Sequence, residues 1–313
     1  MSKRSRLLIA VAAAVVFAAT GGHAASADPG GVGAQAAPSN PGQADGAGII
    51  TVEQTNMCMW GSVETPSCFS NPYEQGAPGW EAAERDTADR KRDSLITQYQ
   101  RHLPDVITVS EGCLSDLEAV ADAIGYQLRY QDTGDGTDGV PRQCTVGRGA
   151  GVNAILAAEF IGDGPQGYFQ EQGYRSYLCA QVSTQEWDSV RVCTTHLSLP
   201  SQGPQPIECA FLRDQVLDPS AGFVIFAGDV NMKGPSRHCA PDRFHGMTNT
   251  EQNPDQVSSR SGLQHIYYSA NGFWRQSCGW SYHVSDTDHR GFLLELGVEA
   301  PEGRGPCWRL IDQ

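Results

Sequence analysis

The sequence lacks a hydrophobic run long enough to cross a membrane. Its longest apolar segment, Leu7–Ala19, is well short of the roughly 20 residues that a spanning helix needs, and no later segment approaches that length. The segment follows three basic residues and leads to the small residues of Ala25–Ala27, which is the order of a secretory signal. We therefore expect residues 1–27 to be a signal peptide cleaved near Ala27, and the mature protein to be secreted, without a transmembrane segment.

Basic residues are also scarce. The chain has 22 Lys and Arg against 36 Asp and Glu, which gives a net charge of -14 at pH 7. Tight binding to nucleic acid without regard to sequence relies on many Lys and Arg contacts with phosphate. The charge therefore argues against a general nucleic-acid-binding protein, but it leaves open a phosphodiester substrate bound at one local site with the help of cations.

No two cysteines stand two residues apart, so the spacing of a zinc knuckle is missing. The ten cysteines are an even count in a chain bound for an oxidising compartment, and five disulfides are the simplest account. Cys179 and Cys193 lie almost symmetrically about "TQEWDS", so two antiparallel strands would bring them opposite each other. The other pairings stay open among Cys58, Cys68, Cys113, Cys144, Cys209, Cys239, Cys278 and Cys307.

Residues 28–48 contain almost no large apolar side chains, so we predict a disordered leader there and a single domain over 49–313. Runs rich in β-branched and aromatic residues predict strands at 49–57, 105–111, 126–130, 152–157, 176–183, 189–197, 223–230, 263–269 and 292–298. Helical patterns cover 80–99, 115–124 and 205–216, and in the first of them Leu95 and Tyr99 should face the core while Lys91 stays in solvent. Because the helices are too few to cover a parallel sheet strand by strand, we expect an α/β sandwich of two sheets with helices outside.

Five of the predicted strands adjoin residues that can bind a metal ion or a phosphate: Asn56, Glu111, His196, Asp229 with Asn231, and Asp288 with His289. Strand ends converge on one edge of a sheet, where a fold can place ligand groups rigidly. Because of the two-residue period of a strand, Asp229 and Asn231 should point to the same side. Carboxylate and amide oxygens suit a hard cation such as Mg²⁺ or Mn²⁺, whereas histidines can contact phosphate or move protons.

A long loop rich in Gly and Asp, 132–151, is a second place where a cation could bind. The spacing of Asp132, Asp135 and Asp138 does not match the calcium loop pattern of carboxylates at every second position. A solvated loop tip is therefore the favoured interpretation, and Ca²⁺ is kept as the alternative.

Several segments are similar to the signature segments of the endonuclease/exonuclease/phosphatase superfamily. They are "PDVITVSEGC", "TTHL", "GDVN" and "TDHRGFLLEL", with "GVNAIL" and "LQHIYYS" resembling intermediate strands, and they occur in the family's order between Ile49 and Val298. The resemblance implies a fold like that of deoxyribonuclease I, a four-layer α/β/β/α sandwich of two mixed sheets. It also implies a metal-dependent phosphoric ester hydrolase, in which water attacks the ester and a cation neutralises the growing charge.

The resemblance assigns roles to the metal and water sites. Asn56 and Glu111 would hold the divalent cation, and Asp288 would help to hold it. Asp229 would align or deprotonate the attacking water, and Asn231 would support both the water and the phosphate.

The remaining roles concern the phosphate. His196 would contact the scissile group, and His289 would stabilise developing charge or act as acid or base. Asn153 of "GVNAIL" is a weaker candidate for a polar contact with the substrate.

The chain also departs from the family pattern. Gln264 stands where the family usually has an Asp that orients the last histidine, here His289; Gln can hold the ring but carries no charge, so activity should be lowered or shifted in pH. Ser110 stands in place of the usual Gln, and Thr287 in place of the usual Ser, which are milder changes.

The substrate class stays open at this point. A nuclease would need basic residues beside the site, and loop candidates are Arg142, Arg148, Arg175 and Arg237. A sphingomyelinase-like enzyme acting on phospholipid would show an exposed aromatic hairpin, for which "NGFWRQSCGWSY" is a candidate, although Cys278 favours a stapled loop. A small-molecule phosphatase and a binding module that has lost turnover are further alternatives. The leading prediction is a secreted, monomeric, nuclease-like phosphodiesterase.

Overall fold

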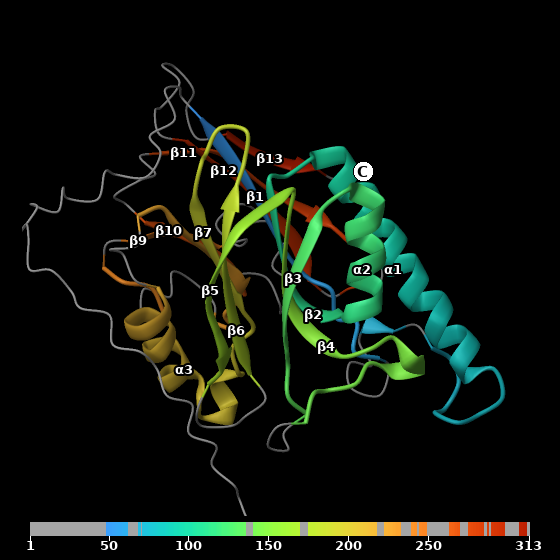
Figure 1. Cartoon of the computed structure of the whole chain (residues 1–313). Coiled ribbons are helices and arrows are strands. Elements are labelled where there is room, and N and C mark those ends of the chain that lie inside the picture. The colour runs from blue at the N-terminus through green and yellow to red at the C-terminus, as the bar shows by residue number, and fades with distance from the viewer. Residues whose placement is uncertain are drawn as a thin grey trace, which may run out of the picture. The chain divides into compact units, whose positions relative to one another are not determined.

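Two mixed β-sheets form the centre of the fold (Figure 1). The computed structural model describes residues 48–61, 68–69, 71–135, 140–169, 175–217, 222–232, 239–242, 244–248, 263–269, 275–284, 287, 289–297 and 307–311. All of them belong to one compact unit, Asn40–Gln313. The predicted signal peptide and nearly all of the predicted leader lie outside the described residues.

The larger sheet has seven strands in the order β13-β11-β12-β1-β2-β4-β3. Their bounds are β1 Ile49–Asn56, β2 Val106–Cys113, β3 Gln127–Asp132, β4 Gly151–Ala157, β11 Arg275–His283, β12 Arg290–Gly297 and β13 Cys307–Ile311. β1 runs parallel to β2 and antiparallel to β12. The C-terminal end of β1 therefore lies beside the C-terminal end of β2 and the start of β12.

The smaller sheet has six strands in the order β5-β6-β7-β8-β10-β9. Their bounds are β5 Glu159–Tyr168, β6 Ser176–Ser183, β7 Val190–Thr195, β8 Val224–Asp229, β9 Phe244–Thr248 and β10 Gln264–Ser269. β7 and β8 are parallel, and β10 runs antiparallel to β8, so the ends of β7 and β8 meet the start of β10.

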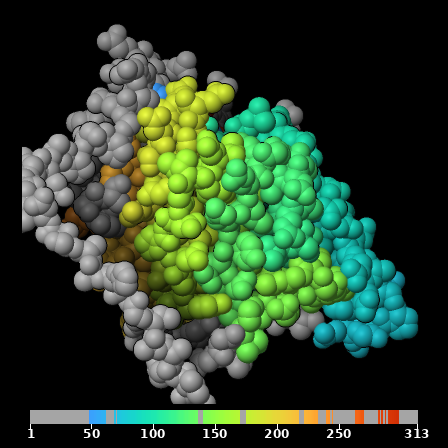
Figure 2. Space-filling view, viewed as in Figure 1, coloured from blue at the N-terminus to red at the C-terminus, as the bar shows by residue number. Residues whose placement is uncertain are grey.

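A dry core joins the two sheets. Apolar side chains from β1, β2, β4 and β12 pack against those of β6, β7, β8 and β10, among them Ile50, Val52, Ile225 and Ile266, all fully buried. Full burial of each such side chain contributes roughly 1.5–3 kcal/mol. The edge strands β3 and β5 of the two sheets also lie side by side on the face shown in Figure 2.

Helices cover the outer faces of both sheets. α1, Trp80–His102, and α2, Leu114–Ile124, pack on the larger sheet, while α3, Gln205–Phe211, and the π-helical η4, Leu212–Val216, pack on the smaller one. The layers are therefore helix, sheet, sheet and helix, which confirms the predicted four-layer α/β/β/α sandwich. Within the described ranges, no helix is both long and apolar enough to span a membrane.

Each strand predicted from the sequence is present, but β5, β9, β11 and β13 were missed. β5 contains Gly162, Gly164 and Pro165 and shifts register twice against β6, so its sequence has no regular alternation. Of the stretch considered as an aromatic hairpin or a stapled loop, residues 275–282 belong to β11, which lies between β12 and β13, and Phe273 and Trp274 lie outside the described residues. Its Tyr282 is buried rather than exposed.

Lys91 was also predicted wrongly, since it is fully buried on α1. Its Nζ donates to the Cys58 carbonyl at 2.7 Å and lies 4.1 Å from the centre of the Phe69 ring. The lysine thus fastens α1 to the segment that follows β1.

Four disulfides are described: Cys58–Cys68, Cys113–Cys144, Cys179–Cys193 and Cys209–Cys239. Cys179 and Cys193 stand opposite each other in the β6–β7 ladder, as the sequence predicted. Cys278 of β11 is the register partner of Cys307 of β13. The expected fifth disulfide stays a prediction, and this register favours Cys278 and Cys307 as its two cysteines.

Candidate active site

Polar residues from both sheets converge where their strands end. Asn56 is the last residue of β1, and its register partner on β2 is Ser110, next to Glu111. His196 follows β7 and bridges to Asp229, the last residue of β8. Gln264 opens β10 directly opposite Asp229.

The Asp229 carboxylate is the most completely hydrogen-bonded group of this site, and it is fully buried. Oδ1 accepts from the backbone N–H of Asn231 at 2.9 Å. Oδ2 accepts from Asn56 Nδ2 at 3.0 Å and from Gln264 Nε2 at 2.7 Å. Burial would raise the pKa of Asp229, but the neighbouring His289 and the hydrogen bonds from Asn56 and the Asn231 backbone bring it below its ordinary value. The carboxylate is therefore ionised at neutral pH and fixed in direction.

The His196 ring joins two other polar groups of the site. Its Nε2 lies 2.9 Å from Asn231 Nδ2, and its Nδ1 lies 3.3 Å from Glu111 Oε1. Burial lowers the pKa of His196 well below its ordinary value, and the nearby Arg175 guanidinium lowers it further. A lowered pKa favours the neutral ring. Because the Asn231 NH₂ group can only donate, Nε2 of a neutral ring accepts from it and the proton is on Nδ1, which makes no hydrogen bond with a described residue.

Glu111 has an unusual backbone conformation. Its φ of 54° lies in the left-handed region, at a bulge where the pairing of β2 with β4 shifts between Val109 and Gly112. The backbone N–H of Met59 donates to the Glu111 carbonyl at 3.0 Å, so the segment after β1 supports the bulge. Strain of this kind costs of order 1–3 kcal/mol and collects at functional sites.

Asn231 reaches the site by a route that the sequence did not predict. β8 ends at Asp229 and Asn231 has a φ of 52°, so the two-residue period of a strand does not apply and that argument was wrong. A turn instead directs the Asn231 amide toward His196, where its Nδ2 also donates to the Leu197 carbonyl at 2.7 Å.

His289 lies immediately before β12 and faces Asp229. Its Nδ1 is 3.4 Å from Gln264 Nε2 and 3.8 Å from Asp229 Oδ2. Its backbone N–H donates to Thr287 Oγ1, and Thr287 Oγ1 donates to the Asn56 carbonyl, both at 3.2 Å. Gln264 therefore contacts Asp229 more closely than it contacts the histidine. Asp288 lies outside the described residues.

Gly228, the first residue of "GDVN", is required by the close approach of β8 to β7. A Cβ atom at this position would stand 2.4 Å from the Thr195 carbonyl oxygen and 3.1 Å from the Thr195 nitrogen. Only glycine therefore lets β8 approach β7 closely enough for His196 and Asp229 to be neighbours.

We predict that Gly228→Ala moves these strands apart and lowers kcat/KM of any reaction at this site by about 100-fold, because about 1 Å of misplacement can cost that much. Crowding should also reduce the stability by about 1–3 kcal/mol, measured by urea unfolding. Gly162→Ala on β5 is the matched control, since its Cβ would meet only Gln181 at 3.6 Å. Equal behaviour of the two variants would contradict the explanation.

The donor atoms at this edge suit a hard divalent cation. Glu111 offers a carboxylate, and Asn56 Oδ1, which accepts from Cys58 N–H at 2.9 Å, keeps a second lone pair. Within the described ranges no three His, Cys, Asp or Glu side chains form a ready-made metal cluster. Mg²⁺ commonly binds through one or two carboxylates and keeps several waters, so Glu111 and Asn56 fit its ligand preference.

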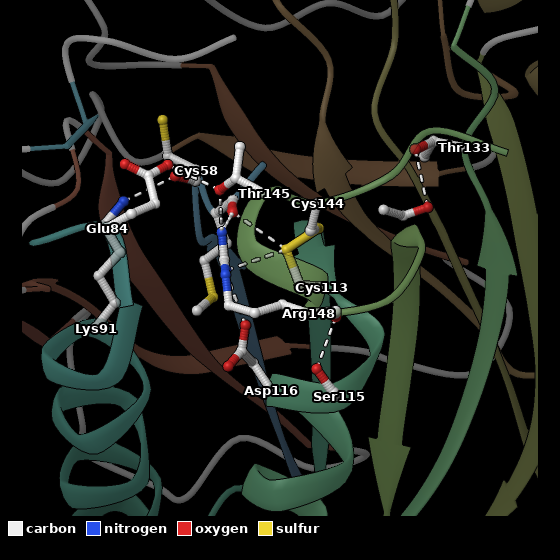
Figure 3. The surroundings of a disulfide bond; sticks show 12 residues. Cys58, Glu84, Lys91, Cys113, Ser115, Asp116, Thr133, Cys144, Thr145 and Arg148 are labelled. Carbon is white, nitrogen blue, oxygen red and sulfur yellow. Dashed lines mark hydrogen bonds and ion pairs between the residues drawn. A yellow bond between two sulfur atoms is a disulfide. The ribbon is translucent and has the colours of Figure 1, made fainter. Parts of the chain in front are cut away.

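Asn153 and Arg148 make hydrogen bonds and an ion pair that connect segments next to the site. Asn153 is fully buried and donates from Nδ2 to the Ser176 carbonyl at 3.0 Å. Figure 3 shows Arg148 between the Cys113–Cys144 disulfide and Asp116, with which it forms a 2.9 Å ion pair. Because its Nη2 also donates to the Met59 carbonyl at 2.6 Å, Arg148 supports the fold and is no candidate for substrate binding. Arg237 lies outside the described residues.

Two residues near the site had no signal in the motifs. Gln54 is fully buried on β1, and its side chain contacts that of Gln264 at 2.8 Å. Trp60 lies between the Arg142 guanidinium, 4.4 Å from its ring centre, and His196, 6.1 Å away between ring centres. The one indication in the sequence that Gln54 matters is that a polar residue occupies a position of the β1 strand whose side chain faces the interior.

The comparisons with known proteins agree with this geometry. Residues 69–289 match the model of the Endonuclease/Exonuclease/phosphatase family. The chain belongs to this family, whose members hydrolyse phosphate esters and generally use divalent metal ions. No curated protein matches the chain.

Solved structures show the same fold. An endonuclease/exonuclease/phosphatase from Beutenbergia cavernae is 17% identical, with a TM-score of 0.55 over 80% of this chain and 72% of that chain. TDP2 from D. rerio, complexed with a single strand DNA product, is 14% identical, with a TM-score of 0.51 over 79% and 98%. The human Nocturnin catalytic domain with bound sulfate is 10% identical, with a TM-score of 0.51 over 79% and 94%.

Proposed function

We propose that the protein is an exported, divalent-metal-dependent phosphodiesterase in which Asp229 activates water. The observation that carries this proposal is the continuous row of contacts from Glu111 through His196, Asn231 and Asp229 to Asn56. The row supports the proposal because it brings a carboxylate that could bind a hard cation close to an oriented, ionised carboxylate that could act as a base. Family membership supports the reaction class.

Asp229 would accept the proton of the attacking water, since its carboxylate is ionised and held by three donors. A divalent cation bound by Glu111 and Asn56, with Asp288 assisting, would neutralise charge on the phosphate oxygens. His289 has Nδ1 toward Asp229, so it would meet the developing charge through Nε2. His196 would keep Glu111 and Asn231 in place, and its contact with phosphate remains an expectation.

Arg142 and Arg175 favour a substrate with further negative charge. The Arg142 guanidinium lies 4.4 Å from the centre of the Trp60 ring, whose centre is 6.1 Å from that of His196. Arg175 is buried, and its charge reaches the site from within the protein, where it lowers the pKa of His196. Cationic side chains attract neighbouring phosphates and repel a choline headgroup. A polynucleotide or another polyanionic phosphodiester therefore fits better than sphingomyelin.

The four described disulfides support export, since such bonds persist in oxidising compartments. A binding module without turnover is the second candidate function, and the replacement of the expected Asp by Gln264 is the observation that favours it. The hydrogen bond from Gln264 to Asp229 weakens that alternative, because it holds the base in its active form.

The deciding experiment uses the purified, oxidised protein. Duplex DNA, RNA, sphingomyelin and a phosphomonoester are assayed side by side with Mg²⁺, with Mn²⁺ and after chelation. We expect metal-stimulated cleavage of a nucleic acid and little cleavage of sphingomyelin. Absence of hydrolysis of every substrate would support the binding module instead.

Gln264→Asp should move the acidic limb of the kcat/KM profile to higher pH. The change removes a donor to Asp229 and adds a like charge, both of which raise the pKa of that carboxyl. Because Asp229 must be ionised to accept a proton, activity would be lost at a higher pH than in the wild type. Gln264→Asn shortens the side chain without adding charge, and superimposed profiles of the two variants would refute the charge argument.

A further inference from the structure

Gln264 has a second glutamine, Gln54, as its neighbour on the side away from Asp229. Gln54 and Gln264 come from different sheets, are both fully buried, and meet through their side-chain amides at 2.8 Å. The Gln54 side chain also contacts the Thr108 hydroxyl and lies 3.4 Å from Ser110 Oγ. The small Ser110, where a glutamine is expected from the family pattern, is compatible with the long Gln54 side chain beside it.

The direction of these hydrogen bonds is set by Asp229. An ionised carboxylate accepts only, so the Gln264 NH₂ group must face Asp229 Oδ2, 2.7 Å away. Gln264 Oε1 then faces Gln54, which has to donate through its own NH₂ group. The Thr108 hydroxyl donates to Gln54 Oε1, so a chain of hydrogen bonds runs from Thr108 through Gln54 and Gln264 to Asp229.

Two contacts of Gln54 favour the opposite orientation of its amide group. Gln54 Oε1 lies 3.3 Å from the Thr108 carbonyl and 3.2 Å from the Ala227 carbonyl, and turning the amide over would give both carbonyls a donor. The same turn would set the Gln54 oxygen against Gln264 Oε1. Turning the Gln264 amide over as well, to separate these oxygens, would then place the Gln264 oxygen against the Asp229 carboxylate. Hydrogen bonds to an ionised group are roughly twice as strong as neutral ones, so Asp229 decides the orientation.

We propose that Gln54 is a positioning residue for this hydrolytic site, which fixes the Gln264 amide so that its NH₂ group faces Asp229. The inference rests on the proposed role of Asp229 for its effect on turnover. Gln54 touches neither substrate nor reacting atoms in this arrangement and acts through Gln264. Without Gln54, the Gln264 oxygen loses its only described partner, so the amide is held from the Asp229 side alone and its position is less well defined.

A double-mutant cycle with Gln54→Met and Gln264→Met tests the kinetic consequence. We expect Gln54→Met to lower kcat on the order of tenfold with KM unchanged, and the double variant to be no slower than Gln264→Met alone. Thr108→Val, which removes only the first donor of the row, should lower kcat in the same direction by less. Single effects that multiply in the double variant would show that Gln54 acts independently, which overturns the proposal.

Side-chain amide NMR with ¹⁵N-labelled glutamine gives a readout that does not depend on turnover. The Gln264 NH₂ signals are identified by their loss in Gln264→Met, and their hydrogen exchange is compared between the wild type and Gln54→Met. We expect faster exchange in Gln54→Met, and unchanged exchange would overturn the proposal. If the wild type hydrolyses no phosphodiester, the proposed function fails, and the NMR comparison still decides the role of Gln54.

Discussion

Asp229→Asn should reduce kcat by about 1,000-fold or more while leaving KM nearly unchanged, because a well-placed general base contributes roughly 10²–10⁴-fold. Asparagine cannot accept the proton of water at neutral pH. Donors face both oxygens of Asp229, so the NH₂ group of asparagine would meet either the Asn231 N–H at the Oδ1 position or the Asn56 and Gln264 amides at the Oδ2 position. Steady-state kinetics on the best phosphodiester substrate, at saturating Mg²⁺, would measure the effect.

The matched control for this variant is Asp163→Asn on β5, whose side chain is 86% exposed. It carries the same chemical change far from the row of contacts and should leave kcat unchanged. A melting temperature within a few degrees of the wild type would show that Asp229→Asn still folds. If kcat of folded Asp229→Asn stayed within tenfold of the wild type, Asp229 would not be the base.

Glu111→Gln should weaken the binding of Mg²⁺ or Mn²⁺ by about 100-fold or more, since it removes the charged oxygen ligand of the proposed cation site. Calorimetric titration of the metal into the protein measures this directly, without substrate. We also expect hydrolysis to fall in proportion at low metal concentration and to recover in part at high concentration.

Glu118→Gln is the control. Glu118 is exposed on α2, the helix that directly follows β2, the strand that carries Glu111. It should bind metal as the wild type does. Unchanged metal affinity in Glu111→Gln would place the cation elsewhere and would remove the central support for the proposed mechanism.

The position of the site could be predicted because it depends on strand direction. Apolar runs identified the strands, and polar residues at their ends identified Asn56, His196 and Asp229, which the parallel pairs β1–β2 and β7–β8 then bring together. These relations follow from local sequence patterns. They do not require knowledge of which side chains meet across the two sheets.

The orientation of individual groups could not be predicted in the same way. The left-handed conformations of Glu111 and Asn231 depend on a bulge and a turn that surrounding structure imposes on residues without a glycine signal. Gln54 contacts Gln264, which is 210 residues away in the sequence. Lys91 donates to the Cys58 carbonyl, which lies close to it only in the folded chain. Such contacts are decided by tertiary packing, which overrides the usual preference of polar side chains for water.

The spacing of two disulfides relative to the cation ligands has a consequence for when the enzyme becomes competent. Cys58 comes two residues after Asn56, and Cys113 comes two residues after Glu111, so each proposed ligand is anchored by its own covalent bond. A newly made chain with reduced thiols lacks both anchors. We therefore expect hydrolysis of phosphate esters to be weak while these thiols are reduced and to rise once both disulfides have formed.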